Sequence, residues 1–253
     1  MTLRLERDGA VATLLIDRPR QHNAMNQEMW ERLPQLVQEA MADEAIRVLI
    51  LTSAAPGLFC AGADIHEFAR HSGEEDWRVA NQAAIRATQY ALAHAEKPVI
   101  AAIDGDAIGG GCGMAIACDL RIASPSARLG ITPAKLGIVY SLFDTRLLVD
   151  LVGPARAKRI LFTAALHDAE DALAISLIDQ IAPAPLEAAV ELARRMAANA
   201  QHSIRSSKAI VRRILDGQAD DDAETLAMFR DAFTLPDFQE GVQAFRDKRR
   251  PRF

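Results

Sequence analysis

The stretch KPVIAAIDGDAIGGGC, residues 97–112, contains the pattern that decides the fold. Val99–Ile103 is a continuous apolar run, which predicts a strand buried on both faces, as in a parallel sheet. Gly105 predicts the turn after this strand, and a helical pattern follows over residues 112–118. The glycines of residues 109–111 stand where that helix begins, so unpaired backbone N–H groups at the helix start are open to a ligand.

A second loop of small residues follows another buried strand. The apolar run of residues 48–52 predicts the strand, and FCAGADI, residues 59–65, comes after it. Small residues let a ligand approach the backbone closely. The glycine run fits neither of the usual nucleotide-binding spacings. Glycine runs often serve only tight turns, but two donor loops that each follow a buried strand suit an oxyanion hole for a carbonyl.

Periodicity divides the chain into a mixed α/β core, residues 1–200, and a helical segment, residues 201–253. The Asp8-Gly9 pair predicts an N-terminal hairpin, and Asn26 predicts the N-cap of the first helix. Further helices are expected at residues 77–95, 142–152, 155–163, 168–175, 186–200, 204–215, 222–233 and 239–248, with one strand at residues 177–181.

Composition excludes several classes of protein. The chain has 253 residues and a formal net charge of −5. This argues against a nucleic-acid partner, because a protein that binds nucleic acid needs clustered positive charge on its surface. The three cysteines, Cys60, Cys112 and Cys118, show neither a disulfide framework nor zinc spacing, so no metal is expected. No signal peptide or membrane-spanning run is visible. We therefore expect a cytoplasmic protein without a membrane partner.

The two loops together resemble the enoyl-CoA hydratase/isomerase family, also called the crotonase family. The resemblance rests on FCAGADI, on residues 97–112 and on Cys118-Asp119. It extends over nearly the whole chain. Near the start, Arg18-Pro19 and Asn23-Ala24 resemble the family's first coenzyme A loop, and near the end residues 240–249 resemble its C-terminal helix.

This resemblance implies an α/β spiral core of repeated strand–strand–helix units, with a C-terminal helical segment that forms trimers or hexamers. It also implies an acyl-CoA thioester substrate and no separate cofactor. Ala63 and Gly110 match the oxyanion hole, where both act through backbone N–H groups. The coenzyme A positions are matched by Arg20, Gln21, His22 and Ala24, which line the adenine and phosphates, by Ala61, Asp64 and Ile65, which flank the adenine and pantetheine, and by Phe245 and Lys248, from this or a neighbouring subunit, near the 3′-phosphate.

The sequence departs from the hydratase pattern at both catalytic carboxylates. A hydratase uses one carboxylate to orient water and one to protonate the α-carbon. The first glutamate of typical hydratases falls at Gly113 here, and the second falls at Pro133. Ordinary two-glutamate hydration is therefore not expected.

Residues 132–140, TPAKLGIVY, are more similar to the methylmalonyl-CoA decarboxylase branch of the family. In that likeness Tyr140 matches a tyrosine near the substrate carboxylate, which makes it the third candidate catalytic residue. Ala63 stands where the branch has a histidine, and Gly113 where it has a glutamate. Decarboxylation needs the enolate stabilised by N–H donors rather than a strong base, so the missing glutamates are compatible with it.

Beside a decarboxylase, a divergent hydratase or isomerase that works without the two glutamates stays open. Further interpretations concern other residues and other kinds of activity. Asp144 is interpreted first as the N-cap of a helix, and alternatively as a nucleophile that would make the protein an acyl-CoA hydrolase or dehalogenase. The lost carboxylates also fit an acyl-CoA-binding protein without catalysis. His66 and Glu67 are expected to be surface residues at a helix start. RNA binding is disfavoured, because basic and aromatic residues do not cluster.

Overall fold

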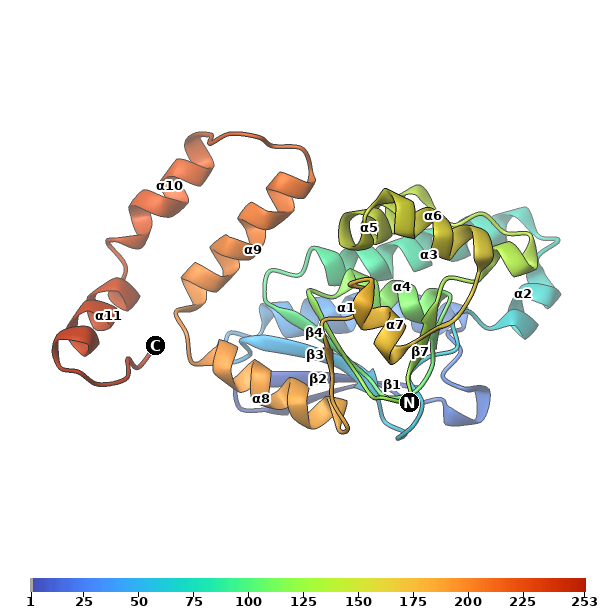
Figure 1. Cartoon of the computed structure of the whole chain (residues 1–253), viewed down its shortest axis with the longest axis horizontal. Coiled ribbons are helices and arrows are strands. Elements are labelled where there is room, and N and C mark those ends of the chain that lie inside the picture. Colours follow the sequence, from blue (N-terminus) through green and yellow to red (C-terminus); the bar gives the residue numbers. More distant parts are fainter. Residues whose placement is uncertain (1) are drawn as a thin grey trace.

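The computed structural model describes residues 2–253 of the chain, and it begins with the predicted hairpin (Figure 1). Strands β1 (Leu3–Asp8) and β2 (Val11–Ile16) pair antiparallel, with Asp8 opposite Val11. Gly9 forms the turn with a φ of +57°, a left-handed conformation that glycine adopts without strain. The hairpin prediction is thus confirmed.

The main sheet has its strands in the order β1-β2-β3-β4-β6-β9, and every pair from β2 onward is parallel. The central strands are buried on both faces, which explains why they read as unbroken apolar runs in the sequence. The remaining strands of this sheet are β3 (Val48–Ser53), β4 (Val99–Ile103), β6 (Leu120–Ala123) and β9 (Gln180–Ile181).

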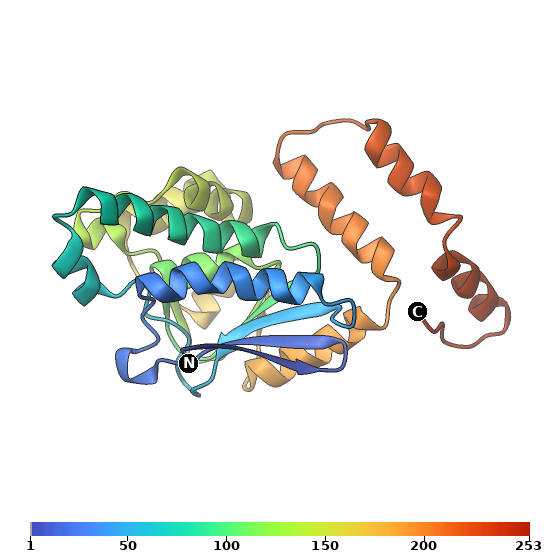
Figure 2. The same ribbon diagram turned by 180° about the vertical axis from the view of Figure 1, so that it is seen from behind.

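Helices cover both faces of this sheet (Figures 1 and 2). Alternate strand residues point to opposite faces. Leu49 and Leu51 therefore join the larger core with α1, while Ile50 joins the smaller core with α8. Asn26 caps α1 as predicted, since its side chain accepts a hydrogen bond from the N–H of Met29. The covering helices are α1 (Gln27–Ala42), α3 (Glu75–Ala93), α4 (Gly110–Ala117) and α8 (Pro185–Ala197).

A small second sheet lies at the amino end of α4. In this sheet β7 (Arg128–Gly130) lies between β5 (Ala107–Ile108) and β8 (His167–Asp168). Gly109, just before α4, donates its N–H to the carbonyl of Gly130 at 2.8 Å, which ties α4 to this sheet. The remaining helices of the core are α2 (Ile65–His71), α5 (Leu142–Val152), α6 (Pro154–Thr163) and α7 (Ala169–Ala174), and of these α5 packs on α4.

The last three helices form an arm that extends away from the core (Figures 1 and 2). They are α9 (Gln201–Leu215), α10 (Ala223–Ala232) and α11 (Pro236–Arg246). Large apolar side chains of this arm are exposed, including Phe229 at 71% and Phe245 at 86%. Such a surface is unusual for a chain that acts alone. Over residues 2–253, no helix has the length and apolar character needed to cross a membrane.

Several predicted elements differ in extent from the structure. Helix α8 ends at Ala197 rather than at residue 200, α9 begins at Gln201 rather than at residue 204, and α11 spans Pro236–Arg246 rather than residues 239–248. The strand expected at residues 177–181 pairs only over Gln180–Ile181, because Leu177 and Ile178 are buried in the loop that precedes it. The helix expected at residues 77–95 begins two residues earlier and ends at Ala93, before the Lys97-Pro98 pair. Proline disfavours a helical conformation in the residue before it, so the helix cannot continue through Lys97 into β4.

Candidate active site

Backbone hydrogen bonds bring the two predicted donor loops together. Cys60 donates its N–H to the carbonyl of Asp106 at 2.9 Å, and Ile108 donates its N–H to the carbonyl of Cys60 at 3.0 Å. The contact is so close that a Cβ on Gly111 would lie 2.3 Å from the Cys60 carbonyl oxygen. Only glycine fits at this position, so part of the glycine run serves the packing of one loop on the other.

Ala63 lies beside the start of α4 with its N–H free. A parallel bridge pairs Ala63 with Met25. In this bridge the carbonyl of Met25 accepts a hydrogen bond from the N–H of Asp64, and the N–H of Met25 donates to the carbonyl of Gly62. The N–H of Ala63 therefore points away from Met25. The Ala63 nitrogen lies 3.8 Å from the position of a Cβ on Gly110. Among the described residues, neither the N–H of Ala63 nor that of Gly110 finds a hydrogen-bond acceptor.

Trp30 forms one wall beside these two N–H groups. Its ring atoms Cη2 and Cζ2 lie 3.0 and 3.1 Å from the position of a Cβ on Gly110, so a larger residue at 110 would press on the indole. Trp30 is fully buried, and its Nε1 has no hydrogen-bond partner within residues 2–253. The sequence predicted Trp30 only as an apolar residue of the first helix, and nothing in its spacing marked it as a site residue.

Gly113, which the sequence resemblance aligns with the first glutamate of typical hydratases, is surrounded by other side chains. Gly113 lies one turn beyond Gly110 in α4, and a Cβ there would lie 2.6 Å from the amide of Gln89 and 2.7 Å from Oη of Tyr140. Gln89 comes from α3 and is buried. Sequence reasoning did not find Gln89, although a glutamine on the buried face of a helix is the signal that could have identified it.

Tyr140 keeps its proton at neutral pH. Burial raises the pKa of its phenol well above the ordinary value, and the nearby Asp144 and Cys112 raise it further. The predicted catalytic residue Tyr140 thus has a neutral hydroxyl. This hydroxyl lies beside Gly113, on the same side of α4 as Gly110.

Asp144 is not an N-cap, so that prediction was wrong. Ser141 caps α5 instead, because Ser141 has the extended backbone of a cap and its Oγ accepts the N–H of Asp144 at 3.1 Å. Asp144 occupies the first turn of α5 and is only 4% exposed. Burial raises the pKa of its carboxyl, against the opposing effects of Ser141 and Arg86.

Pro133, which the sequence resemblance aligns with the second glutamate, begins a short 3₁₀ helix, Pro133–Leu136. The stretch after it is exposed up to Val139, which is 90% exposed. Residues 133–139 contain no carboxylate, since they are apolar residues, glycine and Lys135.

The predicted coenzyme A residues near the start form an exposed loop next to the first donor loop. Arg20, Gln21 and His22 are exposed, and the His22 carbonyl accepts the N–H of Ala61 at 3.0 Å. Buried Asn23 holds this loop in place from inside, since its amide donates to Ser53 Oγ and to the Phe59 carbonyl. The other predicted positions here are half-buried Ala24 and Ala61 and exposed Ile65.

Asp64 stabilises the start of α2. Its carboxylate caps α2, accepting the N–H groups of His66 and Glu67, and forms an ion pair with Arg18 at 2.7 Å. Burial opposes ionisation, but the Arg18 hydrogen bond and the backbone N–H groups outweigh it, so the pKa of Asp64 is lowered. His66 is exposed as expected, whereas Glu67 accepts the N–H of Gln27 and is half-buried.

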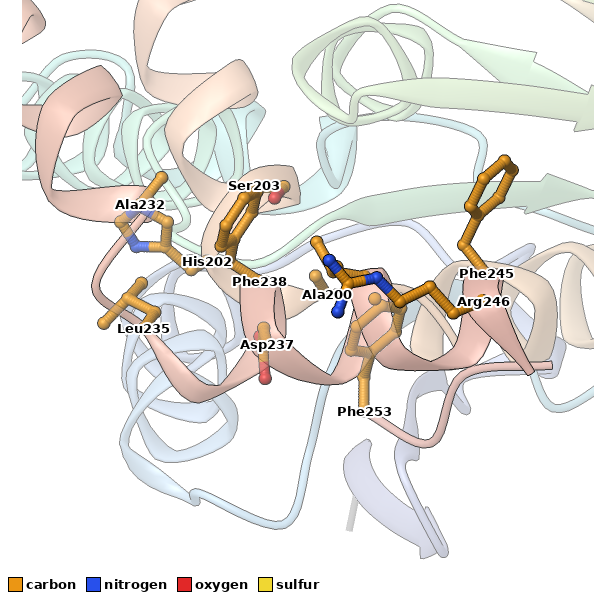
Figure 3. A pocket seen from close by; sticks show the side chains of 12 residues that line it. Ala200, His202, Ser203, Ala232, Leu235, Asp237, Phe238, Phe245, Arg246 and Phe253 are labelled. Atoms are coloured by element: carbon orange, nitrogen blue, oxygen red, sulfur yellow. The ribbon is translucent and has the colours of Figure 1, made fainter. Parts of the chain in front are cut away.

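Phe245 and Lys248 are not near this site in the same chain. Helix α11, which carries Phe245, lies at the opposite end of the molecule from α2 (Figures 1 and 2). Phe245 instead lines a groove of about 500 Å³ between α9 and α11, together with Phe238 and Phe253 (Figure 3). Lys248 follows α11 with a φ of +53° and is exposed.

Comparisons with known proteins give matches over nearly the whole chain. Residues 6–253 match the sequence profile of the family described as enoyl-CoA hydratase/isomerase. The chain is 35% identical over 255 residues to a short-chain-enoyl-CoA hydratase of Clostridium acetobutylicum, covering 97% of this chain and 95% of that one. An enoyl-CoA hydratase/isomerase family structure from Hyphomonas neptunium matches with a TM-score of 0.97 and 39% identity, covering 100% of this chain and 97% of that one.

A third relative is the enoyl-CoA hydratase structure from Bacillus anthracis, which matches with a TM-score of 0.91 and 32% identity, covering 100% of this chain and 99% of that one. These matches confirm the predicted α/β crotonase fold, whereas the likeness to the decarboxylase branch stays a prediction. The chain belongs to the enoyl-CoA hydratase/isomerase family.

Proposed function

We propose that this protein is a lyase that acts on an acyl-CoA thioester and stabilises its enolate between the backbone N–H groups of Ala63 and Gly110. The observation that carries this proposal is that both N–H groups are unpaired among the described residues and lie beside each other at the start of α4. The helix dipole favours negative charge at that end. One such donor typically contributes roughly 3 kcal/mol to transition-state stabilisation.

Two-glutamate hydration does not fit this site. Gly113 and Pro133 replace both carboxylates, and Gln89 and Tyr140 occupy the space that a side chain at 113 would need. Decarboxylation of a malonyl-type thioester fits better, because its electrons come from the breaking carbon–carbon bond. Carbon dioxide leaves, the bonding pair becomes the thioester enolate, and a proton then adds to the α-carbon. The neutral hydroxyl of Tyr140, which lies beside Gly113 one turn beyond Gly110, is our candidate to act on this acyl group.

We further propose that the working form is a trimer or hexamer. The exposed aromatic residues of α10 and α11 would be covered by another copy. Phe245 and Lys248 could then reach the coenzyme A bound to a neighbouring subunit, which they cannot do in their own chain, because α11 lies at the far end from α2 (Figure 1).

The test is incubation of the purified protein with malonyl-, methylmalonyl- and crotonyl-CoA, followed by mass spectrometry of the thioesters. We expect loss of carbon dioxide from a malonyl-type substrate and no addition of water to crotonyl-CoA. Hydration of crotonyl-CoA at rates typical of enzymes would contradict the proposed reaction, and turnover of none of the three would contradict catalysis on this class.

A non-catalytic acyl-CoA binder is the second candidate, and the two lost carboxylates favour it. Fluorescence can distinguish binding from turnover. The chain has two tryptophans, so a Trp77→Phe variant leaves buried Trp30, beside Gly110, as the only reporter. A change of Trp30 fluorescence with acyl-CoA, without any product, would support the binder. The hydrolase alternative is weaker, because the Asp144 carboxylate is engaged by the Gln89 amide.

A further inference from the structure

Gln89 is a buried polar residue at the point where three elements meet. It is 1% exposed and lies on α3, against Gly113 of α4 and against Tyr140 and Asp144 at the start of α5. A buried amide is costly unless each of its ends has a hydrogen-bond partner. The partners of the two ends therefore decide which way the amide points.

One end of the Gln89 amide faces only acceptors. With its nitrogen at this end, the amide donates to the Gly113 carbonyl at 3.2 Å and to Oδ1 of Asp144 at 3.0 Å. The reverse orientation would set the amide oxygen against two other oxygens. The orientation of the Gln89 amide is thus fixed by two acceptors. The Gly113 carbonyl belongs to the backbone and stays in every variant, whereas the Asp144 carboxylate can be removed by mutation.

The other end of the amide then carries its oxygen and faces Tyr140. This end and Oη of Tyr140 lie 2.6 and 2.7 Å from the same point, the position of a Cβ on Gly113. Oη of Tyr140 is buried and has no hydrogen-bond partner among the described residues. A glutamine oxygen at this end is the kind of acceptor that the phenol proton needs.

We propose that Gln89 is a positioning residue that holds the Tyr140 hydroxyl, and that Asp144 fixes the orientation of Gln89. This inference rests on the proposed function, in which Tyr140 faces the reacting acyl group. It also gives a reason for the glycine at 113, since this Gln89–Tyr140 pair takes the volume that a side chain there would fill. The titratable groups that face the cluster are Tyr140, Asp144, Cys112 and Arg86.

The first test is a pH profile of the Gln89→Glu variant. While protonated, the introduced carboxyl group can donate to Asp144 and accept from Tyr140, as the glutamine does. Once ionised, it repels Asp144 and cannot be a donor. We expect this variant to have a kcat close to that of the wild type at low pH. The kcat should fall at least tenfold as pH rises through the pKa of the introduced carboxyl group, with little change in KM.

Gln82→Glu is the matched control, because Gln82 lies on the exposed face of the same helix and should leave the profile unchanged. A Gln89→Glu profile parallel to that of the wild type would overturn the proposal.

The second test needs no turnover. The chain has two tyrosines, Tyr90 and Tyr140, and Tyr90 is 46% exposed. In a Tyr90→Phe background, tyrosine labelled with carbon-13 at the ring carbon that bears the hydroxyl gives one NMR resonance, which comes from Tyr140. We expect Gln89→Met and Asp144→Asn each to shift this resonance in the folded protein.

Both parts of the proposal have a contradicting result. An unchanged resonance in Gln89→Met would exclude the contact with Tyr140, and an unchanged resonance in Asp144→Asn would exclude the orienting role of Asp144. If both variants shift the resonance while the wild type turns over no thioester, the proposed function fails and the positioning network stands.

Discussion

Gly113 offers a direct test of how the site is filled, because the glutamate that the sequence resemblance expects can be introduced there. In a Gly113→Glu variant the new Cβ would lie 2.6 Å from the Gln89 amide and 2.7 Å from Oη of Tyr140. Ordinary contacts of a Cβ begin at about 3.4 Å, so both neighbours must move. Overpacking of this kind costs about 1–3 kcal/mol, and two simultaneous contacts place the variant in the upper half of that range. For a chain of this size, the melting temperature should fall by roughly 4–12 °C.

The assay is thermal unfolding at one protein concentration, because assembly would make the melting temperature depend on concentration. Gly113→Ala isolates the effect of the Cβ from that of the added charge. Gly73→Ala is the matched control, since a Cβ on Gly73 meets nothing within 4 Å. Adding Gln89→Ala to Gly113→Ala should recover about 1 kcal/mol relative to the sum of the single changes. A Gly113→Ala variant as stable as the wild type would refute this explanation of the glycine.

Three further predictions concern the frame of the site. Asn23→Ala leaves the Arg18 N–H and the Phe59 carbonyl without their buried partner, and should lower the free energy of unfolding by about 2–3 kcal/mol in urea denaturation. Burial raises the pKa of Cys60 to about 12, and Cys112 and Cys118 behave alike, so a thiol reagent should label none of them at neutral pH until the protein unfolds. The pKa of Asp64 is lowered in the folded state. Its stabilising effect is therefore present above the ordinary pKa of 3.8 and lost as pH falls through the folded value, and the stability difference between wild type and Asp64→Asn should vanish in acid.

Much of the fold could be predicted because local signals and burial agree in the central strands. Val99–Ile103 is apolar throughout and is buried on both faces, so its strand could be predicted without any tertiary information. Asp144 shows the limit of local signals. Aspartate and serine both favour the N-cap, and the choice between Ser141 and Asp144 depends on where the preceding loop leaves the extended conformation.

The part of the site that could be predicted from the sequence is the part formed by backbone groups. Glycines and small residues marked the loops of Ala63 and Gly110, since close approach of two backbones requires them. Gln89 could not be placed in the same way, because its contact with Gly113 depends on how α3 packs on α4. The exposed aromatic residues of the arm were likewise visible in the sequence only as helix anchors, and a single chain does not show what covers them.

The central claim is that the N–H of Gly110 stabilises the enolate, and one pair of variants tests it. Gly110→Pro removes this N–H at the first position of α4, where proline is tolerated, while Gly110→Ala keeps the N–H and makes the same Cβ contact with Trp30 at 3.0 Å. The measurement is kcat on a malonyl-type thioester for both variants. We predict that Gly110→Pro is slower than Gly110→Ala by about a hundredfold to a thousandfold, with both folded. Equal kcat values for the two variants would contradict the claim.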